Sequence, residues 1–445
     1  MAANESDARL FSLANAISAS VSKMQDLLSA RGIPPPSFDQ DSNFNLPMEV
    51  AEERDVVLDA TAELHDLLLD PLNLIHRHGG HNNSLCLEAI AEFKVADVVP
   101  LNSSVSFADI AKQTPMTEQM TARILRHAMT MRVFHEPEPG MVAHTAASKA
   151  LHHSGANDWL RAGTQEMWPA ATKMVTALKK WPASQEPNET GYSLSNNTDE
   201  TIYAIYARDA ECASRWAKGM SVFAQRPQFN LSYITDHYDW KSLGSAQVVD
   251  IGGSQGHVSM ALARQFDNLT LTVQDMDQVV QSATVPEQLK ERVKVMAHDL
   301  FDTQPIMGAD VYYLRWVLHN WSDKYCHQIL RALQPALRPG ARVVINESLM
   351  PEPGKIARWK EKNLRATDLN MAAAFNGQER TVAEFERLFK HVDAAFELKN
   401  VIEPPGSALG ILEFVWQGGV SSTSGLALEN LAKEGGETED EVSCG

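Results

Sequence analysis

Cysteine is scarce in this 445-residue chain, and long apolar runs are missing. The four cysteines, Cys86, Cys212, Cys326 and Cys444, have neither disulfide nor metal-ligand spacing, which excludes a disulfide scaffold and is typical of a reducing compartment. No apolar run is long enough to cross a bilayer, and residues 1–10 lack the apolar core of a signal peptide. We therefore expect a soluble cytoplasmic protein with no membrane association.

Positive charge is also in deficit. The chain has 39 Lys and Arg residues against 57 Asp and Glu residues, a formal net charge of −18. An acidic protein repels the phosphate backbone of nucleic acids. The composition thus argues against a nucleic-acid partner, while the length allows two or three domains.

The most informative stretch is Val248–Phe266, VVDIGGSQGHVSMALARQF. Its β-branched start predicts a strand buried on both faces, its glycines a tight turn, and its end an amphipathic helix. A dinucleotide fingerprint would need glycine where Ser254 and His257 stand, which argues against NAD. A second strand at 269–274 ends in Asp275, a carboxylate suited to ribose hydroxyls. The pair favours an adenosine-containing ligand; a tight turn with a capping aspartate is the structural alternative.

Strands and helices alternate beyond Asp275. Strands are expected at 292–297, 309–314 and 341–347, helices at 322–337 and 381–392, and a closing hairpin at 396–401 and 409–416. Because parallel strands cannot form a hairpin, the predicted fold class is α/β, a Rossmann-like mixed sheet with an antiparallel hairpin at its end. Ligands in such sheets bind beyond the carboxyl ends of the strands.

The N-terminal part is expected to be helical. A periodic helix at 8–31 has no partner in its own neighbourhood, so we expect it to pack on another subunit; further helices are expected at 49–74, 157–180 and 201–223, with a polar loop at 182–199. Three short helices (84–99, 106–114, 117–131) and a hairpin (133–136 with 141–144) form a winged-helix pattern. Such a domain binds DNA or serves as a scaffold for dimerisation, and the acidic charge favours the second function.

Six motifs together resemble those of one enzyme family. VDIGGSQG (249–256), QDM (274–276), HDLF (298–301), LRWVLHNWSD (314–323), NES (346–348) and NGQERT (376–381) have the order and spacing seen in the caffeate-type S-adenosylmethionine-dependent O-methyltransferases. They most resemble the branch of that family found in fungal secondary metabolism. The resemblance covers residues 49–416; its LHxWSD element is specific, whereas the glycine turn alone is not.

The resemblance implies S-adenosylmethionine as cofactor and a winged-helix segment that serves dimerisation in a homodimer. The glycine turn would hold the methionine end of the cofactor, Asp275 the ribose, and Asp299 with Leu300 the adenine; Arg315 falls where the family often has Lys near the cofactor. The cofactor-binding residues so implied are Gly252, Gly253, Gly256, Asp275, Asp299, Leu300 and Arg315.

The same resemblance implies that His319 is a general base flanked by Glu347 and Glu379. Asn320 departs from the Asp common after this histidine, which removes one negative charge and leaves the base in place. A phenol, with a pKa near ~10, is a poor nucleophile at neutral pH until a base takes its proton. No metal is implied, because a histidine stands where chelating methyltransferases hold an ion with carboxylates. The alternative for His319 is a capping or packing role.

Four segments follow from these observations: an N-terminal helix and linker (1–45), a winged-helix-like dimerisation domain (46–155), an S-adenosylmethionine-binding catalytic domain (156–418) and a disordered acidic tail (419–445). The bulky residues Trp168, Met174, Met371 and Phe375 are candidates to line an apolar acceptor pocket.

The sequence leaves three functions to weigh. The first is an O-methyltransferase acting on a phenolic or enolic hydroxyl of a small polyketide-like aromatic molecule. The second is a methyltransferase-like enzyme that catalyses a dehydration or pericyclic rearrangement, which would not need the base and its two glutamates. The third is a non-catalytic winged-helix regulator, which the acidic charge disfavours.

Overall fold

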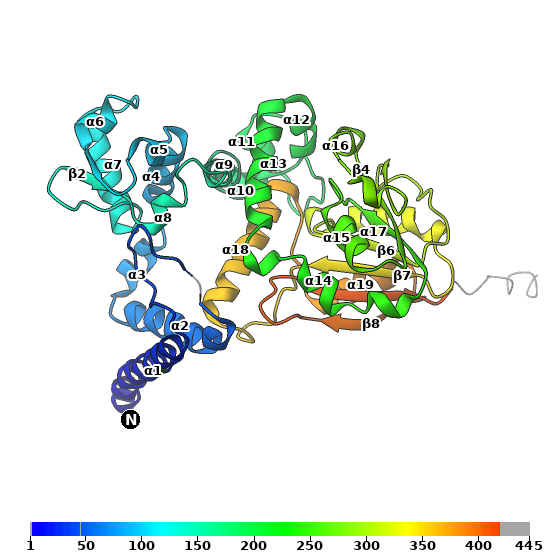
Figure 1. Cartoon of the computed structure of the whole chain (residues 1–445), viewed down its shortest axis with the longest axis horizontal. Coiled ribbons are helices and arrows are strands. Elements are labelled where there is room, and N and C mark those ends of the chain that lie inside the picture. Colours follow the sequence, from blue (N-terminus) through cyan, green and yellow to red (C-terminus); the bar gives the residue numbers. More distant parts are fainter. Residues whose placement is uncertain (1, 45, 419–445) are drawn as a thin grey trace, which may run out of the picture.

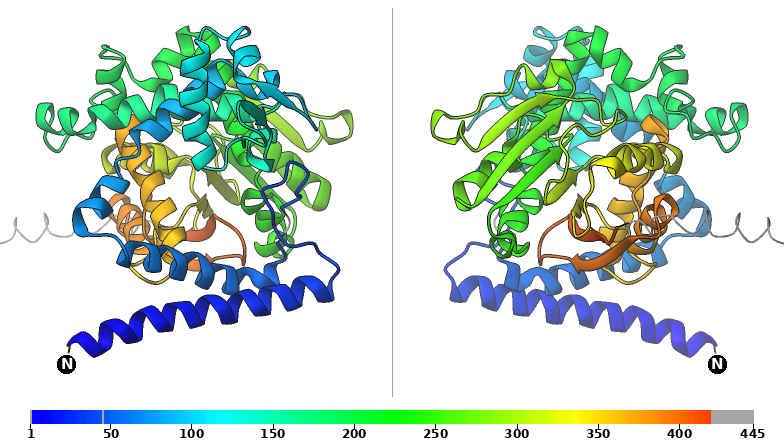
Figure 2. Two further views of the ribbon diagram at one scale, coloured as in Figure 1. Left: turned by 90° about the vertical axis from the view of Figure 1, so that its left-hand side faces the viewer. Right: turned by 90° about the vertical axis from the view of Figure 1, so that its right-hand side faces the viewer.

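The computed structural model describes residues 2–44 and 46–418, so the predicted acidic tail lies outside the described residues. A sheet-bearing domain occupies one side of the molecule and a small helical domain the other, with the helices of residues 156–224 (α9–α13) between them (Figure 1). The N-terminal helix lies along the outer edge (Figure 2). None of the helices in the described ranges is long and apolar enough to cross a membrane.

A seven-stranded mixed sheet forms the centre of the larger domain. Its order is β5-β4-β3-β6-β7-β9-β8, parallel from β5 to β7 and antiparallel over the last two strands. The predicted mixed sheet with its closing hairpin is confirmed. The strands are β3 (Ala246–Ile251), β4 (Leu269–Asp275), β5 (Val293–Ala297), β6 (Val311–Arg315), β7 (Arg342–Glu347), β8 (Phe396–Ile402) and β9 (Gly410–Trp416).

Two apolar clusters bury the two faces of this sheet. Val249 of β3 belongs to one cluster and Val248 to the other, as the two-residue period of a strand requires. Helices α17 (Asp323–Leu333) and α19 (Val382–Val392) cover the first face, and α14 (Ser232–His237) and α15 (His257–Gln265) the second. The short helix α16 (Asp277–Val280) follows β4. Burial on both faces explains why the strands read as continuous apolar runs.

Local signals set several helix ends in this domain. Thr381 and Glu384 form the capping box that begins α19. The helix expected at 322–337 ends at Leu333 and continues as a 3-10 turn, Gln334–Ala336, because Pro335 lacks the N–H that an α-helix needs.

The N-terminal helix α1 (Ala2–Ala30) packs on α2 (Ala51–Leu67) of the same chain. Three ion pairs join this helical hairpin: Arg9 with Glu63, Lys23 with Glu53, and Arg31 with Glu49. The expectation that α1 lacks a partner in its own neighbourhood was wrong, because the proline-rich linker folds the chain back on itself. The 49–74 stretch is likewise divided into a 3-10 turn (Met48–Val50), α2 and α3 (Pro71–Arg77).

Helix α2 also anchors α18 (Arg358–Phe375), a long helix of the catalytic part. Asp59 of α2 accepts hydrogen bonds from the backbone N–H groups of Arg358 (2.6 Å) and Trp359 (2.9 Å), at the α18 N-terminus. A carboxylate at this end of a helix satisfies free N–H groups and favours the helix dipole. The N-terminal hairpin is thereby tied to a helix of the catalytic domain.

The small domain differs from the predicted winged-helix pattern in its strands. Its β2 (Met141–Ala143) pairs with β1 (Ser104–Ser106), while the 133–136 stretch contributes a single bridge from His135 to Ala143. The predicted hairpin is reduced to this one bridge, because Pro137 and Pro139 have no N–H to donate to a longer ladder. The expected helix at 84–99 is also broken, at Lys94, whose φ is +49°. The helices are α4 (His81–Glu92), α5 (Val95–Val98), α6 (Phe107–Ala111), α7 (Glu118–Thr130) and α8 (Ala146–Lys149).

The intervening helices are more divided than their periodicity predicts. The 157–180 stretch is α9 (Ala156–Ala162), a π-helical turn (Gly163–Met167) and α10 (Trp168–Lys180). Asp209 breaks the 201–223 stretch into α12 (Ile202–Arg208) and α13 (Ala210–Ala224) and caps the second. The expected loop at 182–199 contains α11 (Gly191–Ser195). Three further 3-10 turns, Pro227–Phe229, Trp240–Leu243 and Glu287–Leu289, complete these connections.

Candidate active site

The glycine turn after β3 is packed too closely for side chains. A Cβ at Gly252 would lie 2.8 Å from the Val317 side chain, and one at Gly253 would lie 2.6 Å from the Asp250 carboxylate. Gly252 and Gly256 also have positive φ angles of +70° and +78°. The turn therefore brings bare backbone to the carboxyl edge of the sheet, as a nucleoside ligand requires.

Asp250 lies buried beneath this turn. Its carboxylate accepts a hydrogen bond of 2.6 Å from the Ser259 hydroxyl. Burial raises the pKa of Asp250 to about 6, against the lowering effect of that bond.

Asp275 stands at the carboxyl end of β4, next to the turn. Its carboxylate accepts hydrogen bonds from the backbone N–H groups of Ser254 and Met276, both at 2.8 Å. Burial raises the pKa of Asp275, and these two bonds oppose the rise. The contact with Ser254 fixes the glycine turn to the end of β4. Asp275, the residue predicted to bind the ribose, therefore also shapes the loop that would hold the methionine end of the cofactor.

The predicted adenine residues follow β5 on the same rim. The backbone N–H of His298 donates to the Asp275 carbonyl at 3.0 Å, which places the start of the HDLF turn beside β4. Asp299 is exposed, and Leu300 packs against the apolar cluster under the sheet. The structure thus brings the glycine turn, Asp275 and this pair to one edge.

Arg315 is engaged with protein groups. Its guanidinium donates to Asn346 Oδ1 at 2.5 Å and to the Phe229 carbonyl at 3.0 Å, and it lies over the Trp316 ring. These contacts tie β6 to β7 and to the 227–229 turn. A direct role of Arg315 at the cofactor remains a prediction.

The turn that carries the histidine is shaped by a buried carboxylate. Trp316 has a φ of +54°, and the backbone N–H groups of Val317 (2.8 Å) and Leu318 (2.9 Å) both donate to Glu347 Oε1. Glu347 is fully buried at the end of β7. It therefore holds the 3-10 turn Leu318–Asn320 (η6) in place.

His319 projects from this turn between two carboxylates. Its Nδ1 lies 2.9 Å from Glu379 Oε1 and 4.0 Å from Glu347 Oε2, and the imidazole is 14% exposed. Among the described residues, Nε2 has no hydrogen-bond partner. With the Nδ1 proton held by Glu379, Nε2 is the nitrogen that can accept a proton.

The electrostatics of the site favour a basic imidazole. Burial lowers the pKa of His319, but Glu347 and Glu379 raise it, and the net result is a pKa above the ordinary value. Burial also raises the pKa of Glu347, against the opposing effect of His319. These three side chains offer ligand atoms within 4.8 Å of one another. However, Glu347 Oε1 is engaged by two N–H groups and His319 Nδ1 by Glu379, the arrangement of an oriented base.

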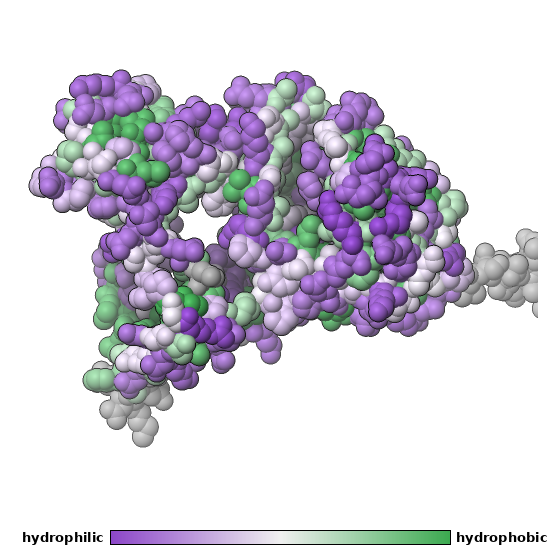
Figure 3. Space-filling view, viewed as in Figure 1, coloured by the Kyte–Doolittle hydropathy of each residue, from purple (hydrophilic) through white to green (hydrophobic). Residues whose placement is uncertain are grey.

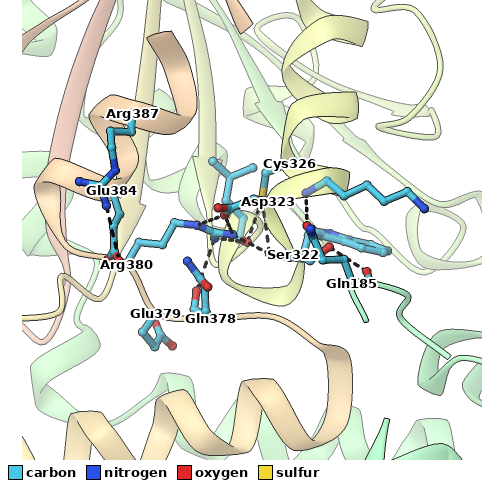
Figure 4. A network of polar contacts seen from close by, with 12 residues as sticks. Gln185, Ser322, Asp323, Cys326, Gln378, Glu379, Arg380, Glu384 and Arg387 are labelled. Carbon is cyan, nitrogen blue, oxygen red and sulfur yellow. Dashed lines mark hydrogen bonds and ion pairs between the residues drawn. The ribbon is translucent and has the colours of Figure 1, made fainter. Parts of the chain in front are cut away.

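Sequence reasoning missed Arg380. Its fully buried guanidinium donates to the carbonyls of Leu318 (2.9 Å) and Trp321 (2.8 Å) and to Asp323 (2.7 Å). Figure 4 shows it reaching from the segment with Gln378 and Glu379 to the start of α17. The available signal was the positive charge of Arg380 directly after Glu379 in NGQERT. Arg380 holds both ends of the histidine turn.

The four candidate pocket residues gather in one apolar cluster. Trp168 and Met174 of α10 pack with Met371 and Phe375 of α18 around buried alanines. Sequence reasoning missed aromatic residues beside them. Tyr203 of α12 lies 5.6 Å from the Trp321 ring and 5.7 Å from Phe375, and Trp216 of α13 lies 6.5 Å from Phe375.

Comparison with known proteins identifies the class of this site. Residues 179–396 match the O-methyltransferase domain, and residues 76–154 match the O-methyltransferase dimerisation domain. The chain is 41% identical to O-methyltransferase PaMT of Phomopsis amygdali over 413 residues, which covers 92% of this chain and 96% of PaMT. The chain belongs to the O-methyltransferase family. As a member it is an S-adenosylmethionine-dependent O-methyltransferase of the branch found in fungal secondary metabolism.

Other relatives of this O-methyltransferase include the grayanic acid biosynthesis cluster O-methyltransferase of Cladonia grayi, 38% identical over 89% of this chain and 85% of that protein. The chlorophenol O-methyltransferase of Trichoderma longibrachiatum is 35% identical over 92% of this chain and 91% of that protein. OxaC, solved with SAH and oxaline, shares the fold with a TM-score of 0.73 at 22% identity, covering 92% of this chain and 99% of OxaC. These findings leave the non-catalytic regulator without support.

Proposed function

We propose that this O-methyltransferase methylates a phenolic or enolic hydroxyl of a small, polyketide-like aromatic molecule, with His319 as the general base. The observation that carries the proposal is the orientation of the imidazole. Glu379 holds Nδ1 at 2.9 Å, which leaves Nε2 to receive a proton. The aromatic cluster around Phe375 supports a planar acceptor.

The chain's own residues divide the work of the reaction. S-adenosylmethionine supplies an activated methyl group when bound. The glycine turn and Asp275 are proposed to hold that cofactor, and the apolar cluster to orient the acceptor oxygen in line with the methyl group. His319 Nε2 takes the hydroxyl proton as the oxygen–methyl bond forms, and Glu347 and Glu379 stabilise the imidazolium. The products are a methyl ether and S-adenosylhomocysteine.

We further propose a homodimer located in the cytoplasm. Exposed apolar side chains line helices α2 to α4, and residues 76–154 match a dimerisation domain. Figure 3 shows an opening between the N-terminal helices and the helices next to the sheet-bearing domain, which a second copy would fill. The exposed apolar residues are Leu67, Leu68, Leu72, Ile75 and Leu85.

Methyl transfer to a panel of phenolic polyketides tests the reaction. Incubation with S-adenosylmethionine labelled at the methyl group is expected to give a product heavier by one methyl. His319→Ala is expected to lower kcat by roughly 10²- to 10⁴-fold, the usual contribution of a general base, while His237→Ala, a change at an exposed histidine, leaves it unaltered.

Two outcomes would contradict the proposal. Full activity of His319→Ala would remove the histidine from the chemistry. A rearranged product without added mass would favour the dehydration or pericyclic alternative.

A further inference from the structure

A third carboxylate, that of Asp368, contacts the backbone of Glu379, the residue that is hydrogen-bonded to His319. Asp368 Oδ1, on α18, accepts a hydrogen bond of 2.8 Å from the backbone N–H of Glu379. The side chain of the same Glu379 accepts from His319 Nδ1 at 2.9 Å. Asp368 therefore contacts the backbone of the residue that orients the base.

The segment that carries Glu379 is pressed against the histidine turn. A Cβ added at Gly377 would lie 2.2 Å from the His319 carbonyl oxygen, and Arg380 donates to the carbonyls of Leu318 and Trp321. These contacts fix the segment on either side of Glu379. The Asp368 bond fixes the backbone of Glu379 itself.

Helix α18 connects this bond to the acceptor side of the site. Met371 lies about one helical turn after Asp368, and Phe375 about two. Both belong to the apolar cluster that is proposed to bind the acceptor. A displacement of α18 by a bound acceptor would thus reach Glu379 through Asp368.

We infer that Asp368 is a positioning residue. It holds Glu379 in place for the hydrogen bond with His319, and it couples the acceptor-side residues of α18, Met371 and Phe375, to the base. The inference rests on the proposed role of His319. It deepens that role, because the imidazole is then oriented by a relay of two carboxylates from different elements.

Charged groups surround both Asp368 and His319. Asp368 is half-buried, and the charged groups facing it are Glu379, Arg365 and Glu384; those facing His319 are Glu347, Glu379 and Arg380. Burial raises the pKa of Asp368, against the hydrogen bond from Glu379. The side chain acts mainly as an acceptor for one N–H, a function that an amide oxygen can also serve.

Two substitutions separate positioning from folding. Asp368→Ala removes the acceptor and is expected to lower kcat about tenfold, the range for a hydrogen bond to a charged group, with KM for S-adenosylmethionine unchanged. In the plot of kcat against pH, the ascending limb of Asp368→Ala is expected at lower pH than that of the wild type, because a displaced Glu379 raises the pKa of the His319 imidazole less. Asp368→Asn keeps an oxygen acceptor and is expected to recover most of kcat. Asp267→Ala and Asp267→Asn, at an exposed aspartate, serve as controls.

Two results would overturn the inference. In the first, Asp368→Ala retains the wild-type kcat and pH profile. In the second, both variants lose activity in proportion to a lower Tm with no change in the pH limb, which a merely structural residue would produce.

A readout without turnover separates this inference from the proposed function. The titration of the His319 imidazole can be followed by NMR in protein labelled at histidine, with His319→Gln to assign its signal. The Asp368→Ala protein is expected to show a lower pKa for His319 even if no acceptor on the panel is methylated. An unchanged titration contradicts the positioning role, whereas absent methyl transfer by the wild type contradicts the proposed function.

Discussion

Opposing effects of burial and charge meet at one imidazole. Burial alone would make His319 a weaker base, and two glutamates reverse that effect. Both glutamates are held in place: Glu347 accepts hydrogen bonds from two backbone N–H groups, and Glu379 lies two residues after Gly377, which packs against the His319 backbone. The raised pKa of His319 therefore depends on backbone contacts that hold the two glutamates, as well as on the glutamate side chains themselves.

Removal of one glutamate charge is expected to shift the pH dependence. A general base works when neutral, so activity rises with pH through the raised pKa of His319. Glu379→Gln removes part of the cause of that raised pKa, so we expect the ascending limb of kcat/KM to move to lower pH. We also expect a maximal rate lower by about tenfold or more, since the imidazolium loses a charged partner.

The matched control for this pH experiment is Glu386→Gln, which changes a surface carboxylate paired with Lys390 on α19. Its profile should overlay that of the wild type. A limb that stays in place in Glu379→Gln, or moves to higher pH, would show that Glu379 does not set the basicity of His319.

At the scale of elements, the proposed acceptor side of the site consists of helices distant in sequence. Helix α10 contributes Trp168, α18 contributes Phe375, and α12 adds Tyr203 against Trp321. The break at Asp209 lets α12 and α13 take different directions, so that Tyr203 and Trp216 reach Phe375 from two helices. The division of the predicted long helix thus brings two aromatic residues to the proposed acceptor side.

Replacement of the Phe375 ring by an aliphatic side chain tests the proposed acceptor side of the site. Phe375→Leu keeps apolar bulk and removes the aromatic contacts with Tyr203 and Trp216. We expect kcat/KM for aromatic acceptors to fall by about two- to tenfold, the range for lost aromatic pairs, while the Kd for S-adenosylmethionine stays constant. Calorimetry and steady-state kinetics measure the two quantities. Met307→Ala, at an exposed methionine, is the control; an equal loss of cofactor affinity in Phe375→Leu would contradict the assignment.

At the scale of the whole molecule, a single chain leaves much apolar surface uncovered. Leu68 is 69% exposed and Leu72 77% exposed, next to the domain matched to dimerisation. The net charge of −18 keeps copies of the chain apart in general, so a specific apolar contact is needed for association. This surface is the proposed subunit interface.

Charge placed on this surface is expected to separate the subunits. The double variant Leu68→Asp and Leu72→Asp should run as a monomer in light scattering, where we expect the wild type to run as a dimer, because the carboxylates would have to be buried unpaired. Met307→Asp adds charge to an exposed apolar site elsewhere and should leave the dimer intact. A wild-type monomer, or a double variant that remains dimeric, contradicts the proposed interface.

The sequence by itself determined what depends on local order along the chain. Continuous runs of β-branched and other apolar residues set the strands, Thr381 with Glu384 set the start of α19, and the closing hairpin required a mixed sheet. The glycine turn and Asp275 also came to one rim as predicted, because parallel strands end at the same edge. The spacing of apolar residues and the residue types that form turns act over a few residues, so they can be recognised in the sequence without knowledge of the fold.

Only the tertiary structure decided which distant residues meet. His319 and Glu379 are 60 residues apart and touch because Arg380 and Gly377 fix their segments together. The pairing of β2 with β1, the packing of α1 on α2, and the engagement of Arg315 by Asn346 likewise depended on partners that no local pattern names. Such contacts arise from the packing of whole elements, in which burial and the pairing of polar groups are satisfied together.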